Sequence, residues 1–240
     1  MNPTVLVEAQ PQSINVDPTK AAVIVVDMQN DFVSEGGLFE HAGVDISGAQ
    51  KVIAPIAQVL TAARAAGLSI VYLKMGYGSD LSDLGAPGSV NRDRHLHFGV
   101  GQPMRAPDGS EGRFLIRGTW NTEIVDELKP EPADIVIDKT RFSGFYQTDL
   151  DATLKKLEIK YLIVAGVTTS ICVESTVRDA MFRDYLCIML RDCMSEPIGH
   201  DLPRTNHEAS LLNAELLFGW VSDSQRLIQA LSSIATEAVR

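Results

Sequence analysis

Three residues that can do chemistry follow short apolar runs in this sequence. Asp27 ends "AAVIVVD", Lys139 ends "ADIVIDK", and Cys172 comes shortly after "YLIVAGV". A carboxylate can take the proton of a thiol and return it to a leaving amine, and a lysine can keep that carboxylate ionised. A helix N-terminus and a nearby cation both lower the pKa of a thiol. Together the three side chains describe a cysteine amidohydrolase that needs no histidine.

Each of the three residues also has an ordinary interpretation. Asp27 alone suits a loop hydrogen bonder, Lys139 a solvated surface group, and Cys172 a small buried hydrophobe. Their joint position after three apolar runs is what these interpretations leave unexplained.

The apolar runs predict the elements that must position these side chains. Runs rich in β-branched residues suit strands buried on both faces of a parallel sheet. Such strands are predicted at 21–27, 69–75, 133–139, 161–167 and 186–192, with a short sixth strand near "GWVS". Apolar residues at three- and four-residue spacing predict helices between them. These helices are expected at 47–66, with Ser47 as N-cap and Gly67 as its end, and at 121–128 with Asn121 as N-cap, 147–159, 170–185, 204–217 and 223–237.

The alternation predicts a single-domain α/β fold. We expect a doubly wound, Rossmann-like, mostly parallel sheet of five or six strands with helices on both faces. Residues 1–20 are expected to form an N-terminal arm, and 21–240 the hydrolase domain. Residues 76–118 show no periodicity and predict a long loop that acts as a lid or an interface. Because parallel strands end at one edge of a sheet, Asp27, Lys139 and Cys172 are expected to meet there.

The bulk composition excludes several classes of partner. The chain has 240 residues, a formal net charge of -10 and no Lys/Arg block, so binding to nucleic acid or to an anionic membrane is not expected. It contains no apolar run of the roughly 20 residues that a membrane span needs, and no secretory signal is visible. Three cysteines do not suggest a disulfide framework, and a cytoplasmic location fits best.

The histidines and known motifs suggest neither a metal nor a cofactor. None of the five histidines ends a predicted strand, and "HLH" (95–97) is interpreted as two exposed loop histidines. The alternative is an extended segment that presents both imidazoles to a metal. A CxxC, an HExxH, a P-loop and a GxGxxG after the first strand are all missing. Cys187 and Cys193 are expected to be structural.

Three motifs around these residues resemble one family. "VIVVDMQNDF", "DKTRFSGF" and "GVTTSICVESTVRDA" look like the isochorismatase-like cysteine hydrolases, and the resemblance covers roughly residues 20–235. It implies an Asp27–Lys139–Cys172 triad and a cis peptide bond between Val167 and Thr168. It also implies an oxyanion hole formed by the N–H groups of Thr168 and Cys172. Members that cleave isochorismate lack the cysteine, so Cys172 favours amide hydrolysis.

Several segments resemble two groups within that family. "GAPGS", "VDEL", "RFSGFYQTDLD", "CVESTVRD" and "FGWVSD" are similar to ureidoacrylate amidohydrolases, and "GYGSDLSDL" and "GRFLIRG" to biuret amidohydrolases. Both groups cleave a terminal ureido or carbamoyl unit. The sequence departs from the ureidoacrylate pattern at Phe142, where a tyrosine is expected, and Met75 offers no amide to a carboxylated substrate. The metal-binding Asp/His cluster of the nicotinamidase branch is not matched.

The resemblance implies hydrolysis of a C–N bond in a small ureido, carbamoyl or linear amide substrate, without a cofactor. Its alternatives are biuret and N-carbamoyl amino acids, and, in a different class, a non-catalytic homologue whose thiol senses redox state. A homo-oligomer, a dimer or a tetramer, is also expected. The candidate substrate-binding residues, each of which can equally be explained by packing or surface contacts, are Asn30, Phe32, Tyr77, Trp120, Arg141 and Phe142.

Overall fold

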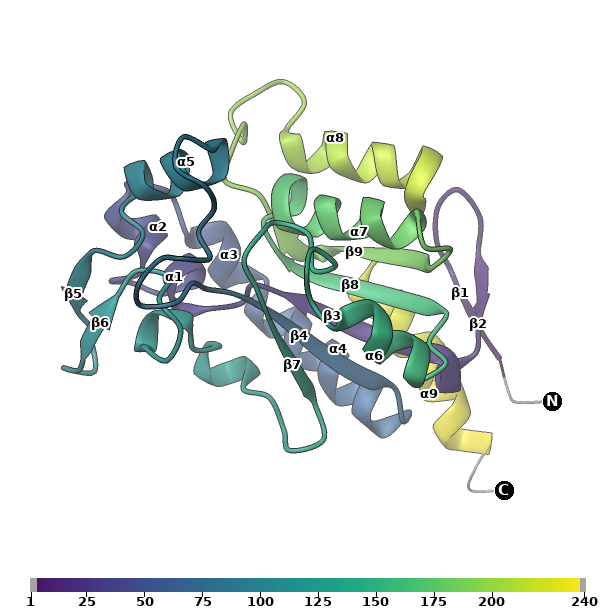
Figure 1. The fold of residues 1–240 in the computed structure, drawn as a ribbon. Helices are drawn as coiled ribbons and strands as arrows, with labels where there is room; N and C mark the ends of the chain where they lie inside the picture. Colours follow the sequence, from purple (N-terminus) through teal and green to yellow (C-terminus); the bar gives the residue numbers. More distant parts are fainter. Residues whose placement is uncertain (1–3, 238–240) are drawn as a thin grey trace.

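The structure, a computed structural model, describes the backbone of residues 4–237 and the side chains of residues 4–233. Its centre is a six-stranded sheet of order β10-β9-β8-β3-β4-β7, in which every neighbouring pair is parallel (Figure 1). The strands are β3 (Ala21–Val26), β4 (Ser69–Met75), β7 (Ile135–Lys139), β8 (Tyr161–Val167), β9 (Leu186–Ser195) and β10 (Gly219–Ser222). The chain builds outward from β3 to β7 and then returns to place β8 on the other side of β3. The predicted doubly wound α/β fold is confirmed, and the sheet has its sixth strand.

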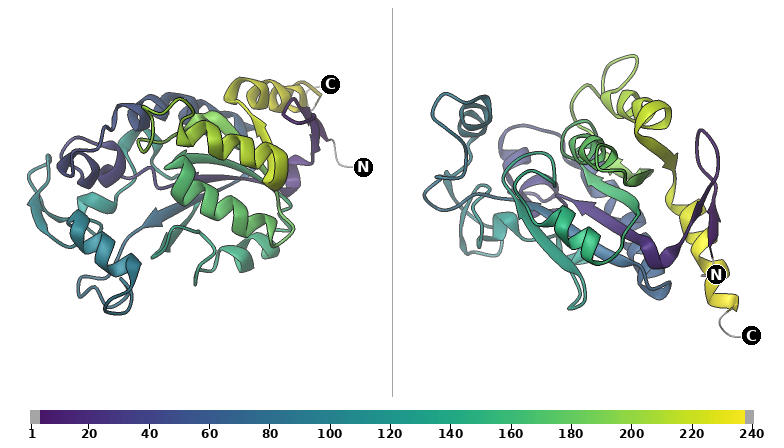
Figure 2. Two further views of the ribbon diagram at one scale, coloured as in Figure 1. Left: turned by 90° about the horizontal axis from the view of Figure 1, so that it is seen from above. Right: turned by 45° about the vertical axis from the view of Figure 1, so that its right-hand side comes forward.

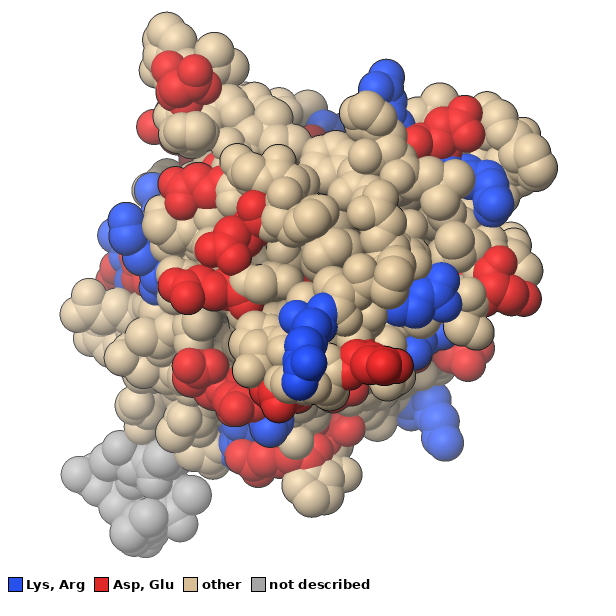
Figure 3. Space-filling view, turned by 90° about the vertical axis from the view of Figure 1, so that its left-hand side faces the viewer, with Lys and Arg blue, Asp and Glu red and all other residues tan. Residues whose placement is uncertain are grey.

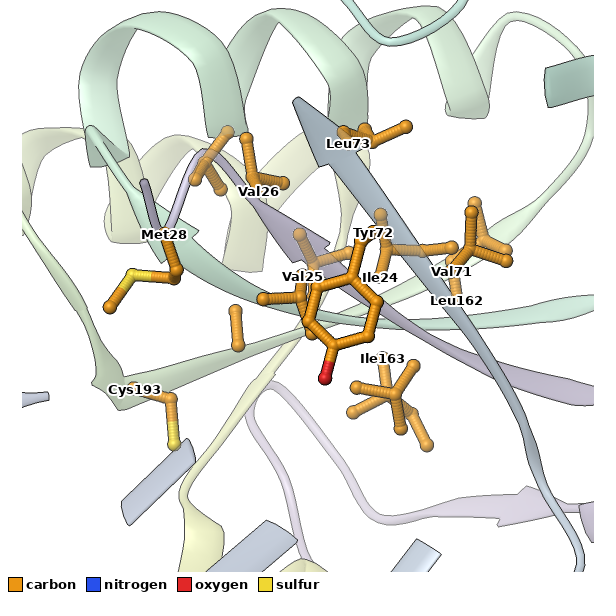
Figure 4. Close-up of a cluster of buried hydrophobic side chains, with 14 of the residues drawn as sticks. Ile24, Val25, Val26, Met28, Val71, Tyr72, Leu73, Leu162, Ile163 and Cys193 are labelled. Carbon is orange, nitrogen blue, oxygen red and sulfur yellow. The ribbon is translucent and has the colours of Figure 1, made fainter. Parts of the chain in front are cut away.

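The central strand β3 is buried along its whole length. All six of its residues are shielded from solvent, because β4 and β8 flank it and helices cover both faces. Figure 4 shows Ile24, Val25 and Val26 among side chains from the two neighbouring strands. The apolar run fills the core, so the first polar side chain after it emerges at the edge of the sheet.

Helices cover both faces of the sheet. The chain forms α1 (Asn30–Val33), α2 (Leu38–His41), α3 (Ser47–Lys51), α4 (Ile53–Ala65), α5 (Val90–Phe98), α6 (Leu150–Lys156), α7 (Glu174–Met181), α8 (Asn206–Asn213) and α9 (Ser224–Glu237). Helices α4 and α9 pack together on one face, and α6, α7 and α8 lie on the other (Figure 1). The strand order reverses between the neighbouring strands β3 and β8, and folds of this kind bind ligands beyond the carboxyl ends of the strands at such a point.

The predicted helix at 47–66 is divided in two at Val52. Ser47 does not cap it, because the Asp45 carboxylate accepts hydrogen bonds from the N–H and hydroxyl of Ser47 and Ser47 is already the first helical residue. Gly67 does end the second part, with a φ of 75° that a glycine adopts without strain.

The expected N-terminal arm contains a hairpin in its described part. Strands β1 (Val5–Val7) and β2 (Ile14–Val16) pair antiparallel, and η1 (Pro18–Lys20) follows as a 3-10 turn. The inward residues of both strands are buried, and β1 packs beside α9 (Figure 2). Gln10 exchanges two backbone hydrogen bonds with Val221 at the edge of the central sheet. Residues 1–3 of the expected arm and 238–240 of the expected domain lie outside the described residues.

The segment 76–118 is not the irregular loop that was predicted. It contains α5 and a hairpin of β5 (Pro103–Arg105) and β6 (Glu111–Arg113). No residue of α5 is fully buried, so the helix has no apolar face from which the sequence could reveal it. Local signals form it instead: the Ser89 hydroxyl accepts from the N–H of Arg92, and Gly99 ends it with a φ of 105°. This segment forms the end of the molecule opposite the N-terminal hairpin (Figure 1).

The predicted helix at 121–128 is wrong. The chain there makes two 3-10 turns, η2 (Trp120–Thr122) and η3 (Asp126–Leu128), joined by extended residues. The backbone between them pairs with the segment after β3, through Asn30 N–H to Glu123 O (2.9 Å) and Val125 N–H to Met28 O (3.1 Å). Tertiary pairing therefore outweighs the local helical spacing.

The predicted helix that precedes β9 begins with a π-turn, and the predicted helix that precedes β10 ends with one. The helix expected at 170–185 is η4 (Thr169–Val173), a π-turn, followed by α7. The helix expected at 204–217 is α8 followed by a second π-turn, η5 (Ala214–Phe218). The first of these departures matters for function, because Cys172 lies in η4.

Two features of the described residues bear on possible partners, namely the length of the helices and the charges on one face. None of the helices in the described part of the chain is both long and apolar enough to cross a membrane. On the face drawn in Figure 3, Lys and Arg side chains are scattered among Asp and Glu side chains.

Candidate active site

Asp27 lies immediately after β3, at the edge where the strand order reverses. Its backbone has a φ of 51°, and its N–H donates to Leu73 O of the neighbouring strand at 2.9 Å. The side chain is 1% exposed. Its Oδ2 accepts a hydrogen bond from Nζ of Lys139 at 2.7 Å. Its Oδ1 is buried and has no hydrogen-bond partner among the described residues, so one carboxylate oxygen stays available to accept a proton.

Lys139 is the last residue of β7, with β4 between it and β3. Its ammonium group is buried and contacts Asp27 Oδ2 and the carbonyl of Arg141. Burial lowers the pKa of Lys139, but the charges of Asp27 and Cys172 beside it raise the pKa above its usual value. The ammonium group therefore stays charged and compensates the buried carboxylate.

Cys172 lies in the π-turn η4, which β8 delivers to the same edge. The N–H of Val173 donates to the carbonyl of Thr168 at 3.2 Å, and the Thr176 hydroxyl donates to the carbonyl of Cys172 at 2.7 Å. Glu196, just after β9, holds Ser170, two residues before Cys172: it accepts from the N–H and the hydroxyl of Ser170 at 2.7 and 2.6 Å. The backbone that carries the thiol is thus held by hydrogen bonds at both ends of the turn.

The thiol is protonated in this environment, contrary to the lowered pKa expected from a helix start and a cation. Burial, and next the charge of Asp27, raise the pKa of Cys172 well above the usual range, and Lys139 opposes this only in part. Burial likewise raises the pKa of Asp27, while Lys139 and Cys172 lower it. Nucleophilic attack from this site requires a base, and Asp27 is the carboxylate near enough to be coupled to the thiol.

The peptide bond between Val167 and Thr168 is cis. Both residues and Cys172 line the same cavity as Asp27.

The cavity measures about 210 Å³. That is smaller than the roughly 300–1,000 Å³ typical of drug-sized ligands, so it suits a small metabolite. Its polar wall is confined to Asp27, Thr168 and Cys172 and to two residues of α5, and the remainder is mostly apolar side chains such as Phe32, Leu38, Phe39, Phe98, Leu115 and Ile198.

Two of the six candidate substrate-binding residues, Phe32 and Phe142, line the cavity. The other four do not. Asn30 uses its amide to donate to the carbonyl of Trp120 at 2.8 Å, and Trp120 itself is half-buried. Tyr77 is completely buried beneath the cavity wall, and Arg141 donates to the carbonyls of Asp83 and Thr140. These four residues hold the surrounding loops.

Sequence reasoning missed Arg94 and His95 of α5, which both line the cavity. His95 is half-buried and His97 exposed, so the interpretation of "HLH" as two exposed loop histidines is wrong. On a helix, residues two apart point in different directions, which also removes the extended metal site. Among the described residues, no three His, Cys, Asp or Glu side chains come together as a metal site. The signal that would have found Arg94 and His95 is the Ser89–Gly99 pair of helix ends.

Comparison with known proteins identifies the family of the chain. Residues 21–226 match the Isochorismatase domain. The chain is 43% identical to the ureidoacrylate amidohydrolase RutB of Caulobacter segnis over 91% of this chain and 88% of that protein. A cysteine hydrolase from Pseudomonas syringae pv. phaseolicola has a similar structure, with a TM-score of 0.76 and 30% identity over 91% and 95% of the two chains. N-carbamoylsarcosine amidase from Thermoplasma acidophilum gives a TM-score of 0.63 and 26% identity over 85% and 96%.

The family match spans most of the chain and includes all three residues of the Asp27, Lys139 and Cys172 cluster. The predicted family is confirmed: the chain belongs to the isochorismatase family of hydrolases.

Proposed function

We propose that the protein is a cysteine amidohydrolase that cleaves a C–N bond in a small ureido, carbamoyl or linear amide substrate. Asp27, Lys139 and Cys172 are its catalytic residues in this proposal. The relatives support the reaction class, since one is named ureidoacrylate amidohydrolase and one N-carbamoylsarcosine amidase. Hydrolysis of non-peptide amide bonds is common to both names.

One observation carries the proposal. The free Oδ1 of Asp27 is buried beside a thiol whose pKa is raised, and both groups line one small cavity. A buried, unpaired carboxylate oxygen costs free energy unless something uses it. A proton from Cys172 satisfies that oxygen and creates the nucleophile in the same step.

The first half of the reaction forms a covalent intermediate. Asp27 Oδ1 takes the thiol proton as Sγ of Cys172 attacks the substrate carbonyl carbon. The carbonyl oxygen becomes an oxyanion, which the N–H groups of Thr168 and Cys172 stabilise. The C–N bond then breaks, and the Asp27 carboxylic acid gives its proton to the leaving nitrogen. Ammonia or an amine departs, and a thiocarbamate or thioester remains on Cys172.

The second half uses water. Asp27, again a carboxylate, takes a proton from a water molecule whose oxygen adds to the carbonyl carbon. The C–S bond breaks, and the proton on Asp27 returns to the thiolate of Cys172. The product is a carbamate from a ureido substrate or a carboxylic acid from a simple amide. Lys139 stays protonated throughout and keeps Asp27 ionised between proton transfers.

The substrate proposed first is ureidoacrylate or a close analogue, and the alternatives are biuret and N-carbamoyl amino acids. A screen for ammonia release across these compounds tests the proposal. Turnover of at least one compound, abolished by Cys172→Ser in a protein with an unchanged circular dichroism spectrum, is the expected result. Full turnover in that variant would contradict it.

The non-catalytic redox sensor gives a different result in the same screen. It predicts no ammonia release from any compound and reversible oxidation at Cys172. The ion pair of Asp27 and Lys139 has no task in a sensor, and therefore catalysis is the better explanation of the site.

A homo-oligomeric state and a cytoplasmic location are also proposed. A homo-oligomer, in which 76–118 covers its own or a neighbouring site, is testable by light scattering of the eluting protein. A cytoplasmic location follows from the cysteine content, and the three cysteines are all free and buried.

A further inference from the structure

The charge of the cavity wall is the feature that the proposed reaction leaves unused. Asp27 and Arg94 are the charged side chains that line the cavity. The charge of Asp27 is already matched by Lys139 at 2.7 Å. Arg94 therefore gives the cavity a net positive charge at a place where the reaction mechanism needs none.

Arg94 differs from its arginine neighbours in having no partner. Arg92, two residues earlier, donates to the carbonyl of Leu81 at 3.1 Å. Arg117 forms an ion pair with Asp83 at 2.7 Å, and Arg141 donates to two carbonyls. Within the part of the chain that the structure describes, the exposed side chain of Arg94 makes neither an ion pair nor a hydrogen bond. Its five N–H donors are free for a ligand.

His95 beside it is a neutral group and does not compete for an anion. Its Nδ1 lies 2.6 Å from the carbonyl of Asn91, so Nδ1 carries the proton and donates it. Burial lowers the pKa of His95, and the charges of Arg141 and Lys139 lower it further. The ring lies between Tyr77 and Phe142, with centroids at 5.5 and 5.8 Å. Its Nε2 is then an acceptor, suited to a substrate N–H.

We propose that Arg94 binds a carboxylate of the substrate, and that the protein therefore acts on ureido monocarboxylates in preference to uncharged ureides such as biuret. This inference rests on the proposed amidohydrolase function. A guanidinium group binds a carboxylate through two parallel N–H···O bonds. The triad engages the ureido carbonyl, and Arg94 engages the acid group, so a linear ureido acid is held at both ends.

The net charge of the whole protein opposes the approach of an anionic substrate. The formal net charge is -10, which repels anionic substrates at long range. Helix α5 lies beyond the end of the sheet where the strands end (Figure 2), and its residue Arg94 lines the cavity. Among the described residues that line the cavity, Arg94 is the one Lys or Arg side chain that an anionic substrate can meet.

The test compares two substrates that differ in one group. 3-Ureidopropionate carries a carboxylate where propylurea carries a methyl group. The readout is the ratio of kcat/KM for the acid to kcat/KM for propylurea. Arg105 of β5 supplies a matched control, because its side chain is exposed, lies outside this cavity and has no ion pair or hydrogen bond with the described residues. Arg105→Met removes the same charge from the protein.

The wild-type protein is expected to prefer the acid. Arg94→Met should lower the ratio by roughly 10- to 100-fold, the worth of one charged hydrogen-bonding contact. The loss should appear in KM, because the carboxylate contact is the same in the ground state and the transition state. Arg94→Lys keeps the charge and loses the paired donors, so its ratio should lie between those of the wild type and Arg94→Met. Arg105→Met should leave the ratio unchanged.

Three results would overturn the inference: an unchanged ratio in Arg94→Met, an equal fall in Arg105→Met, or a wild-type preference for propylurea. Cys172-dependent ammonia release with any of these results leaves the proposed function standing and removes only the role of Arg94. No ammonia release from either compound or from the wider screen would overturn both.

Discussion

Asp27 and Lys139 end strands that β4 separates, yet the Nζ of Lys139 lies 2.7 Å from Oδ2 of Asp27. Each of the two residues is only 1% exposed. A buried carboxylate without a cation would be protonated and useless as a base. In the proposed reaction, the ion pair with Lys139 is therefore what lets Asp27 act as a base.

Removing one partner of this pair should destabilise the protein more than removing both. Lys139→Met leaves the Asp27 carboxylate buried without compensation, at a cost of about 3–5 kcal/mol in the free energy of unfolding. The double variant Asp27→Asn with Lys139→Met should recover most of that loss and remain inactive. Urea denaturation of the three proteins measures this. A single variant as stable as the wild type would show that the pair is not buried in solution.

The pH dependence of kcat/KM should report the titration of Asp27. The base works only when deprotonated, so the rate rises with pH through the pKa of Asp27. Because burial raises that pKa, the acid limb should lie above the ordinary aspartate value of about 3.9. Since the thiol enters the reaction protonated, no second rise near its usual pKa of about 8.5 is expected. A rate that follows thiol ionisation would instead indicate a preformed thiolate.

The buried carboxyl group of Asp31 should make the free energy of unfolding depend on pH. The carboxylate accepts from the N–H groups of Leu38 and Leu115 and from the amide of Asn121. Burial raises its pKa to about 6 despite these bonds. The folded state therefore holds this proton more tightly than the unfolded state, and this stabilisation is present below about pH 4. It is lost as the pH rises to about 6, and amounts to about 3 kcal/mol.

Asp31→Asn removes that titration, so comparing the variant with the wild type at two pH values isolates the contribution of Asp31. Urea denaturation at about pH 4 and about pH 7 should show the variant gaining on the wild type toward neutral pH. A difference in stability that stays constant between the two conditions would contradict the assigned pKa.

Gly166 holds β8 close to β3 just before the cis peptide bond. It has a φ of 117°, and a Cβ at this position would lie 2.1 Å from the carbonyl oxygen of Val26. Gly166→Ala should therefore cost more than about 3 kcal/mol of stability and displace Asp27 from Cys172. Gly43→Ala is the control: Gly43 has a φ of 77° but nothing within 4 Å, so only about 1–2 kcal/mol of backbone strain is expected. Equal thermal shifts for the two variants would contradict the close approach.

The sheet and the three catalytic candidates were predictable from sequence because each depends on a local pattern. β-Branched runs specify the buried strands, and the residue after each strand must lie at the sheet edge. Asp27 and Lys139 follow directly from that rule. The distance between them, and the free oxygen of Asp27, depend on side-chain contacts between non-adjacent strands, which no local pattern encodes.

The substrate side of the site was less predictable. Helix α5 has no buried face, so periodicity gave no sign of it, and Arg94 and His95 were missed with it. Asn30 and Arg141 were chosen for their polar groups, but backbone carbonyls use those groups. Whether a polar side chain faces a ligand or a loop is decided by tertiary contacts.

The most direct test of the account is the rate of ammonia release by Cys172→Ala, measured beside Cys187→Ala with the best substrate of the screen. Cys187 is fully buried within β9, away from the cavity, so its variant controls for the loss of a thiol. Cys172→Ala is expected to release no ammonia above the uncatalysed rate, while Cys187→Ala is expected to retain turnover. Turnover by Cys172→Ala at the wild-type rate would contradict the assignment of Cys172 as the nucleophile.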